Sequence, residues 1–463
     1  MQKRHFHLAV IGAGPAGLSA ALAATKAGLE VILLDDQPDV GGQVYRQLTR
    51  NCKMKQPYLG QSYFSGRNMV DEMQHFSGVY APRTTVWQIT AERDIAIVVD
   101  GKAEMLSADY ILIATGAIER PMPVSGWTLP GVMSVGGAQT LLKTSALGAE
   151  NAVFVGCGPL LYLTIWQYLQ AGLPVRAVLD ITRPAQWRSA IAYAPLALLQ
   201  PKLLISGWKW LRKIRRQCAF IPHVSSVDII GTDHATGIRY ETEHGAKGEF
   251  ISDHIFLHQG VMPNINLTMA TGLHHRWNDH AHYWQPVVDQ NGQSSDPHIY
   301  VAGDGGGIGG AAAAALAGTN AARAIIAKLK PETGISLPGG LLSQLCRWRA
   351  KAIRPFLDRL YLPPADMRLP QRDDTVVCRC ENVRKADIDA ALSNAVTGPN
   401  QLKAFCRAGM GRCQGRSCGI MVQEMIAAHH KQSLSQTGYY RLRPPVKPLT
   451  LAELASLDGP WPV

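Results

Sequence analysis

The stretch that decides the fold is FHLAVIGAGPAGLSAALAATKAGLEVILLDD, residues 6–36. It predicts a short apolar strand, a turn with Gly12, Gly14 and Gly17 in G-x-G-x-x-G spacing, an Ala- and Leu-rich helix, and a second apolar strand that ends at Asp35. In such a unit the first glycine permits the tight turn, the second lets the backbone approach a pyrophosphate, and the third lets helix and strand pack closely. The acid can accept a ribose hydroxyl. The chain therefore begins with a predicted dinucleotide-binding domain.

A second unit of the same plan is NAVFVGCGPLLYLTIWQYLQAGLPVRAVLD, residues 151–180. Gly156 and Gly158 are present, but Leu161 replaces the third glycine, at the point where helix and strand should pack most closely. Three interpretations stay open: a structural remnant, a site that keeps an adenine nucleotide on its first two glycines, or a working nicotinamide site. Arg183, just past the acid at Asp180, could meet a 2′-phosphate.

Three further segments accompany the first unit: LLDDQPDVGGQVYRQ from residue 33, YILIATGAIERPMPVSG from residue 110, and HIYVAGDGGGIGGAAAAALAG from residue 298. Together they resemble the two-dinucleotide-domain flavoproteins, which include the thioredoxin reductase and glutathione reductase types. The resemblance implies FAD, with Asp304 on the ribityl chain. The cofactor-binding residues that it implies are Gly12, Gly14, Pro15, Ala16, Gly17, Asp35, Gly42, Gln43, Val86, Thr115, Gly116, Gly303 and Asp304. No Cys-x-x-Cys pair precedes or interrupts these domains, so the dithiol relay of a disulfide reductase is missing.

Four cysteines lie close together near the C-terminal end: Cys378 and Cys380 in TVVCRCENV, and Cys413 and Cys418 in GMGRCQGRSCG. Thiolates suit zinc, copper(I) or iron–sulfur clusters, and four of them can form a structural zinc site. A flavin in the same chain favours a [2Fe–2S] cluster, which exchanges single electrons with it. Between the pairs we expect two short helices around a small core, which would consist of Val383, Ile388, Leu392, Leu402 and Phe405.

These cysteine motifs resemble the bacterioferritin-associated-ferredoxin-like [2Fe–2S] domain. With ATGAIERPMPVSGWTLPGVMS and VGCGPLL they resemble the version in the alpha subunits of hydrogen cyanide synthase, opine oxidases and related amino-acid or hydroxyproline dehydrogenases. Cys406 stands where such sequences usually have a hydroxyl residue and is not assigned to the cluster.

The resemblance implies an FAD-dependent electron-transfer subunit that takes electrons from a partner. That partner is a beta subunit of the D-amino-acid-oxidase type, and a small ferredoxin-like subunit is a further candidate. Two alternatives remain: an NAD(P)H-dependent flavin and iron–sulfur reductase, and a docking subunit with idle cofactors.

Charge is unevenly spread along the 463 residues, with 46 Lys and Arg against 35 Asp and Glu and a net charge of +11. Lys and Arg concentrate among apolar residues in WKWLRKIRRQ, residues 208–217, and CRWRAKAIRPFLDR, residues 346–359. Such stretches are either solvated helix faces with buried tryptophans or contacts to an anionic membrane or an acidic partner. No nucleic-acid-binding motif accompanies the charge. Without a secretion signal, we expect a cytoplasmic protein, with peripheral contact to the inner face of the membrane as a further option.

The predicted class is α/β, with two Rossmann-like domains and a small helical [2Fe–2S] domain. The FAD domain is expected from residues 1–124 and 285–330, with the altered nucleotide domain, 125–284, inserted between them. A basic linker, 331–372, the cluster domain, 373–430, and an extended arm, 431–463, complete the chain. GLHHRWNDHAHYW, with His274, His275, His280 and His282, is expected to be a surface loop, because neither a regular ligand spacing nor an acid partner supports a metal site there.

Overall fold

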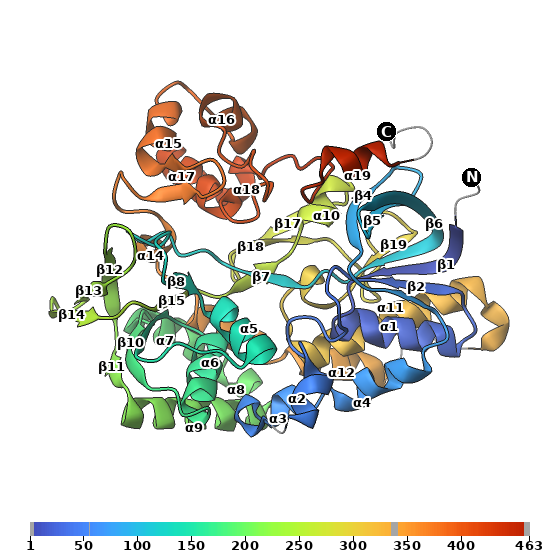
Figure 1. Cartoon of the computed structure of the whole chain (residues 1–463), viewed down its shortest axis with the longest axis horizontal. Coiled ribbons are helices and arrows are strands. Elements are labelled where there is room, and N and C mark those ends of the chain that lie inside the picture. The colour runs from blue at the N-terminus through green and yellow to red at the C-terminus, as the bar shows by residue number, and fades with distance from the viewer. Residues whose placement is uncertain (1–3, 55, 335–340, 458–463) are drawn as a thin grey trace.

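The first dinucleotide-binding fold is built on a seven-stranded sheet (Figure 1). The computed structural model describes residues 4–54, 56–334 and 341–457. The sheet contains β1 (Arg4–Ile11), β2 (Val31–Leu34), β3 (Val79–Ala81), β4 (Thr85–Ile89), β5 (Asp94–Val99), β6 (Lys102–Ile113) and β19 (Ile299–Val301), in the order β3-β2-β1-β6-β5-β4 with β19 beside β6. β1 is buried on both faces, as is typical of a parallel strand under helices, because Leu8 and Val10 point into one core and Ala9 and Ile11 into another.

Helices α1 (Pro15–Lys26) and α11 (Ala311–Leu329) pack against each other on one face of this sheet. A Cβ at Gly318 would lie 1.9 Å from the carbonyl oxygen of Ala16, so only glycine allows this approach. The remaining short helices of this part are α2 (Leu48–Lys53), η1 (Pro57–Leu59), α3 (Gln61–Phe64), α4 (Arg67–Glu72), η2 (Met73–His75), η3 (Gly303–Gly306) and η4 (Pro331–Thr333).

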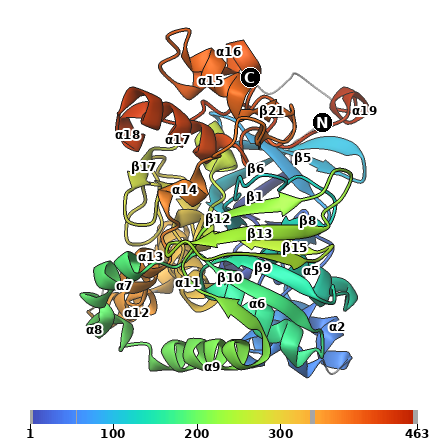
Figure 2. The same cartoon turned by 90° about the vertical axis from the view of Figure 1, so that its left-hand side faces the viewer.

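The second dinucleotide-binding fold has a five-stranded parallel sheet in the order β11-β10-β9-β15-β8. Its strands are β8 (Val132–Ser134), β9 (Ala152–Gly156), β10 (Val175–Asp180), β11 (Ala219–Ile221) and β15 (Ile255–His258). The helices are α5 (Val135–Ser145), α6 (Pro159–Gln170), α7 (Pro184–Ile191), α8 (Ala194–Ala197) and α9 (Pro201–Gln217). An antiparallel sheet of β12 (Val224–Ile230), β13 (Gly237–Thr242) and β14 (Lys247–Ile251) lies at its edge (Figure 2). The predicted α/β class with two dinucleotide-binding folds is confirmed.

The chain between the two sheets is ordered, and one expectation for it was wrong. It forms β7 (Ala117–Glu119), paired with β16 (Val261–Pro263), then α10 (Asn266–Ala270) and a hairpin of β17 (His275–Asn278) and β18 (Tyr283–Pro286). The histidine-rich stretch, expected to be a surface loop, is this hairpin. His282 is buried and meets an acid, Glu424, because the hairpin packs against the C-terminal part of the chain.

The C-terminal part is mostly helical. Residues expected as a linker contain α12 (Leu341–Lys351), α13 (Arg354–Leu360) and α14 (Ala365–Arg368). The small cysteine-containing domain has β20 (Val376–Cys378), β21 (Val383–Arg384), α15 (Lys385–Leu392), α16 (Pro399–Cys406) and α17 (Gly419–His430). Four of its five predicted core residues are buried, but Phe405 is 53% exposed, because it lies near the end of α16, at the margin of the face that Pro399 and Leu402 bury.

The predicted arm is not extended throughout, since it contains α18 (Leu434–Thr437) and α19 (Leu451–Ala455). Tyr440 is buried in the cysteine-containing domain, where its hydroxyl donates to Ala408 O at 2.9 Å. Farther on, Val446 N donates to Trp87 O on β4 at 3.0 Å, and Lys447 pairs with Asp36. The arm therefore ties the cysteine-containing domain to the first sheet of its own chain.

A buried ion cluster at Glu424 of α17 also holds the cysteine-containing domain in place. Its carboxylate lies 2.9 Å from Arg368 Nε, 3.1 Å from His282 Nε2 and 4.0 Å from Arg120 Nη1. Burial opposes the charge, yet hydrogen bonding with His282 and the positive charges of Arg368 and Arg120 lower the pKa of Glu424 to about 2. Beside it, Trp284 Nε1 donates to Gln423 Oε1 at 3.0 Å. The cluster joins four separate segments of the chain.

We predict that Glu424→Gln destabilises the protein by about 3 kcal/mol at pH 7, because it leaves buried positive charge facing a neutral amide. The pKa of Glu424 is lower in the folded protein than its ordinary value of 4.5. Its stabilisation is therefore present above pH 4.5 and is lost as the pH falls towards 2. Urea unfolding at several pH values measures the difference between variant and wild type, which should shrink over that interval.

Glu92→Gln, in the exposed turn between β4 and β5, is the matched control and should change stability by less than about 0.5 kcal/mol. An equal effect of both variants would contradict the role given to Glu424.

Candidate functional site

The glycine-rich turn of the first fold has the geometry of a phosphate site. Gly14 is the N-cap of α1 and no side chain caps the helix, so the first N–H groups point outward. A Cβ at Gly17 would lie 1.8 Å from Gly12 O, whereas a Cβ at Gly14 would meet only Gly42 Cα, at 3.9 Å. Gly17 is thus required for packing, and Gly14 leaves open space in front of the helix. Pro15 and Ala16 form the buried first turn of this helix.

Asp35 follows the end of β2, and its two carboxylate oxygens accept from two different segments, the glycine-rich turn and the residues after β2. Oδ2 accepts from Ala13 N at 2.5 Å and Oδ1 accepts from Gln37 N at 2.7 Å. Burial raises the pKa of Asp35, although these two N–H groups oppose the shift. Each oxygen has a second lone pair, so a ribose hydroxyl can still donate to this acid.

Gly42 and Gln43 follow Asp35 in the chain, and a lysine of the second fold binds the backbone of this segment. Gly42 has a φ of +59°, and a Cβ there would lie 2.9 Å from Gly14 Cα. Lys143 of α5 donates to Gln43 O at 3.0 Å and to Val44 O at 3.2 Å. Burial lowers the pKa of Lys143 to about 7. No motif or spacing in the sequence indicates this lysine, because the contact crosses between domains.

The ends of β6 and β19 lie side by side at the same edge of the sheet. Gly116 has a φ of +68° and no atom within 4 Å of a Cβ built there, so the backbone is open. Thr115 Oγ1 donates to Asn264 O at 3.3 Å. Asp304 Oδ1 accepts from Gly309 N at 2.8 Å and from Gly310 N at 3.0 Å, which fixes the carboxylate at the entrance of α11.

Two further predicted residues lie around this edge. Gly303, with a φ of +76°, packs its backbone against Ala16, since a Cβ there would lie 2.9 Å from Ala16 Cβ. Val86 is in β4 at the edge of the sheet, and its side chain is 7% exposed in the core. It could therefore meet a ligand only through its backbone.

The structure brings the four predicted cysteines close together, since the Cys418 thiol interacts with those of Cys378, Cys380 and Cys413. Cys378 is hydrogen-bonded to Cys418, and this bond lowers the pKa of Cys378 to about 6 despite its burial, with help from the N–H groups around it. Cys380 pairs with Cys413, whose pKa is raised by burial and by this neighbour. In the described ranges, no three His, Cys, Asp or Glu side chains are grouped to hold one metal ion.

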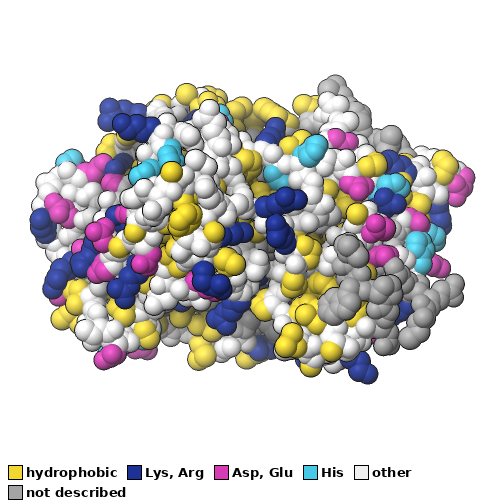
Figure 3. Space-filling view, turned by 90° about the horizontal axis from the view of Figure 1, so that it is seen from above, with side chains coloured by type: hydrophobic (Ala, Val, Ile, Leu, Met, Phe, Trp, Pro, Cys, Tyr) yellow, Lys and Arg dark blue, Asp and Glu magenta, His cyan; other side chains and the backbone are white. Residues whose placement is uncertain are grey.

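Small residues allow the cysteine loops to approach each other. A Cβ at Gly411 would lie 2.2 Å from Cys380 Cβ, so the loop can pass there only with glycine. Gly409 and Gly415 have φ values of +85° and +76° and lie against the ring of Tyr440. Figure 3 views the molecule from above, and Lys and Arg side chains are scattered over this surface.

The cysteine loop is connected to the edge of the first sheet by a short chain of hydrogen bonds. Gln414 O, next to Cys413, accepts from Asn266 Nδ2 at 3.1 Å. Two residues earlier, Asn264 N donates to Gly116 O at 3.0 Å. One loop, residues 264–266, therefore contacts both the cysteine loop and the end of β6, where the flavin is predicted to bind.

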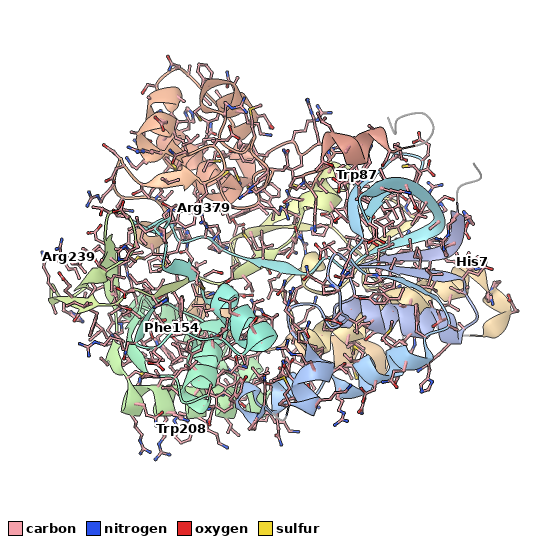
Figure 4. The ribbon with its side chains drawn as sticks, in the orientation of Figure 1. His7, Trp87, Phe154, Trp208, Arg239 and Arg379 are labelled. Atoms are coloured by element: carbon pink, nitrogen blue, oxygen red, sulfur yellow. The ribbon has the colours of Figure 1, made fainter. Side chains whose placement is uncertain are left out.

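In the second fold, the segment after α13 lies over the turn that contains Gly156 and Gly158. A Cβ at Gly158 would lie 4.0 Å from Tyr361 Cβ, and Gln186 Nε2 donates to Leu362 O. Arg183, considered for a 2′-phosphate, pairs instead with Asp366 and, at 3.2 Å, with Glu243. Leu161 is fully buried between helix and sheet (Figure 4 labels the neighbouring Phe154).

A cavity of about 500 Å³ remains beyond this cover, at the end of β10. Its walls include Asp180, Arg215, His223 and four aromatic rings, those of Tyr162, Trp187, Phe220 and Tyr361. Its volume is in the range of small-molecule sites.

Comparison with known proteins agrees with this architecture. The pyridine nucleotide-disulphide oxidoreductase family matches residues 6–173, and the sarcosine oxidase A3 domain matches residues 373–457. The A subunit of opine oxidase from Rhizobium meliloti is 41% identical, over 98% of this chain and 88% of its own length. The chain belongs to the family of opine oxidase A subunits.

As a member of the opine oxidase family, the chain is an FAD-dependent oxidoreductase. Hydrogen cyanide synthase subunit HcnB of Pseudomonas protegens is 28% identical, over 97% of both chains. Among solved structures, L-proline dehydrogenase from P. horikoshii has a TM-score of 0.70 at 19% identity, over 98% of this chain and 80% of that one. Thioredoxin reductase from T. acidophilum has a TM-score of 0.52 at 20% identity, over 71% of this chain and 99% of that one. These two likenesses show the fold of this opine oxidase family member.

We predict that Asp304→Ala weakens FAD retention about tenfold to a hundredfold, because it removes a charged hydrogen-bonding group and frees the loop before α11. The ratio of flavin absorbance to protein after gel filtration measures the effect. Asp279→Ala, in the exposed turn of the β17–β18 hairpin, should keep the wild-type ratio. Unchanged flavin content in the Asp304 variant, with the fold intact by circular dichroism, would refute this assignment.

Proposed function

We propose that this chain is the FAD- and [2Fe–2S]-containing electron-transfer subunit of an amine or amino-acid oxidase or dehydrogenase complex. The observation that carries the proposal is the contact of one loop, residues 264–266, with both the cysteine loop at Gln414 and the strand end at Gly116. Two redox groups held at these places would lie on the two sides of a single loop.

The described residues fit an FAD. The open turn at Gly14 would receive the pyrophosphate on the N-terminus of α1, and Asp35 would accept a ribose hydroxyl. Asp304 would hold the ribityl chain through Oδ2, because Oδ1 already fixes its own loop. Gly42, Gln43, Thr115 and Gly116 would line the flavin side. When bound, this group supplies one- and two-electron chemistry, and the protein positions and tunes it.

The cysteines fit a cluster with two iron ions. Four thiols from two loops can supply two ligands to each iron of a [2Fe–2S] cluster. A flavin in the same chain favours this redox group over a structural zinc ion. The backbone N–H groups near Cys378, from Gly409, Glu381 and Cys380, favour negative charge on sulfur. The ligands would be Cys378, Cys380, Cys413 and Cys418.

The proposed electron donor is a second subunit. Opine oxidase and hydrogen cyanide synthase are named as having subunits, and the proline dehydrogenase neighbour acts on an amino acid. By likeness, a flavoprotein beta subunit of the D-amino-acid-oxidase type would oxidise the amine, and this chain would carry the electrons to an acceptor. A small ferredoxin-like subunit is a further candidate partner.

A nicotinamide-dependent reductase is the weaker proposal, because Tyr361 lies over the second glycine turn and Leu161 fills the space of its third glycine. The cavity at Asp180 is still large enough for an adenine nucleotide, whose base would stack on an aromatic ring while Arg215 meets phosphate. We propose such a nucleotide as a structural ligand only.

The anaerobic optical and electron paramagnetic resonance spectrum tests the electron-transfer role. We expect the purified chain to show a flavin and a reducible cluster that stay oxidised when NADH or NADPH is added. Rapid bleaching by either nicotinamide would establish the reductase instead. When the amine and the partner protein that oxidises it are both present, a flavin that stays oxidised would establish the docking subunit with idle cofactors.

Cys413→Ala should abolish iron binding and the cluster signal while FAD stays at the wild-type ratio, because the two sites lie in separate domains. The matched control is Cys406→Ala: this nearby thiol donates only to Leu402 O, at 3.5 Å, and its loss should spare both groups. Iron and flavin contents of the two variants are compared. Loss of FAD with the cluster in the Cys413 variant, or loss of iron in the control, would contradict the separate sites.

A further inference from the structure

The stretch of the second fold that contains α9 is rich in cations and has no acid of its own. Residues 181–227 contain eight Lys and Arg and no Asp or Glu. Helix α9 lies within this stretch, along the lower edge of the molecule in Figures 1 and 2. A surface of one charge sign attracts the opposite charge at long range and repels its own kind.

The outer face of α9 is apolar as well as basic. Ile205 is 52% exposed and Trp208 is 58% exposed, and Figure 4 labels Trp208 at the lower edge. Lys202, Lys209 and Arg212 are exposed at helical spacing on the same face, and the Arg212 guanidinium lies 5.2 Å from the Trp208 ring centre. The opposite face, which includes Ile214, is buried in the protein. The interpretation of solvated faces with buried tryptophans is therefore wrong for Trp208.

Helix α12 also carries an exposed tryptophan. Gln200, just before α9, donates through Nε2 to Arg349 O at 2.6 Å and Ala350 O at 3.0 Å, which brings the C-terminal end of α12 to the start of α9. Trp348 of α12 is 53% exposed. No helix in the described ranges is long and apolar enough to cross a bilayer, so contact with lipid at this surface would be peripheral.

We propose that this face of α9, consisting of Lys202, Ile205, Trp208, Lys209 and Arg212, docks the protein on an anionic lipid bilayer. Tryptophan and isoleucine enter the interfacial layer, and the cations meet lipid phosphates. The apolar side chains stand singly among cations along a helix at the edge of the molecule, which suits insertion between headgroups. A second copy of this face would bring like charges together. The inference does not depend on the electron-transfer role.

Sedimentation with sucrose-loaded vesicles tests the proposal on the full chain as purified. Vesicles of phosphatidylcholine mixed with phosphatidylglycerol should bind at least about tenfold more tightly than vesicles of phosphatidylcholine alone, and high salt should weaken the binding. Lys209→Gln with Arg212→Gln should weaken it about thirtyfold, at the usual contribution of each cation near an anionic surface. Ile205→Ser with Trp208→Ser should weaken it at least about tenfold, through lost apolar burial.

The matched control is Lys247→Gln with Ile251→Ser on β14, which removes one cation and one exposed apolar side chain from another surface and should bind like wild type. Trp208→Phe should keep binding but lose part of the fluorescence quenching by brominated lipid. Flavin content and circular dichroism check that each variant is folded.

Three results would overturn the proposal: equal binding to neutral vesicles, an unchanged affinity of the Ile205 and Trp208 double variant, or binding lost equally in the β14 control. A dimer in sedimentation velocity that this double variant converts to monomer would assign the face to a second copy of the chain instead.

Discussion

The position of the cysteine-containing domain depends on one buried carboxylate. Glu424 lies in a helix that begins immediately after Cys418, and a lone charge at this depth would cost several kcal/mol. It becomes stable only where Arg368, His282 and Arg120 meet it. Because these partners come from α14, the β17–β18 hairpin and the segment after β7, the domain has one orientation in which the charge is satisfied. That orientation also sets Gln414 on Asn266, so the ion cluster determines what the cysteine loops can contact.

In the second fold the glycines of the dinucleotide motif also serve packing. Gly156 has a φ of +135°, and a Cβ there would lie 1.6 Å from His258 O, so the sheet itself requires this glycine. Where a nicotinamide cofactor would need the third glycine, Leu161 joins the core, and Tyr361 covers the turn from outside. The surviving glycines are therefore no evidence for a bound nicotinamide. The turn has become a docking place for the helices that lead to the cysteine-containing domain.

Local patterns could be predicted from the sequence, and contacts between distant segments could not. Strand, turn and helix around Gly12 follow from backbone sterics within a few residues. The acidic partner of His282, the lysine under Gln43 and the cover by Tyr361 all join residues far apart in the chain. The spacing of apolar and polar residues along the chain does not indicate such long-range contacts. For Trp208, the helical pattern predicted the faces of α9 but not which face the protein covers.

The arrangement of the two ends of the molecule connects the proposed membrane contact with the proposed electron transfer. Figures 1 and 2 place the cysteine-containing domain at the top of the molecule and α9 along its lower edge. If α9 rests on a bilayer, the cysteine loops face the aqueous side, where a second subunit can approach them without displacing lipid. The positive charge that attracts the bilayer is concentrated at the opposite end from the buried Glu424 cluster, so docking would leave the ion cluster intact. Membrane attachment and assembly with a partner would then use separate surfaces and need not compete.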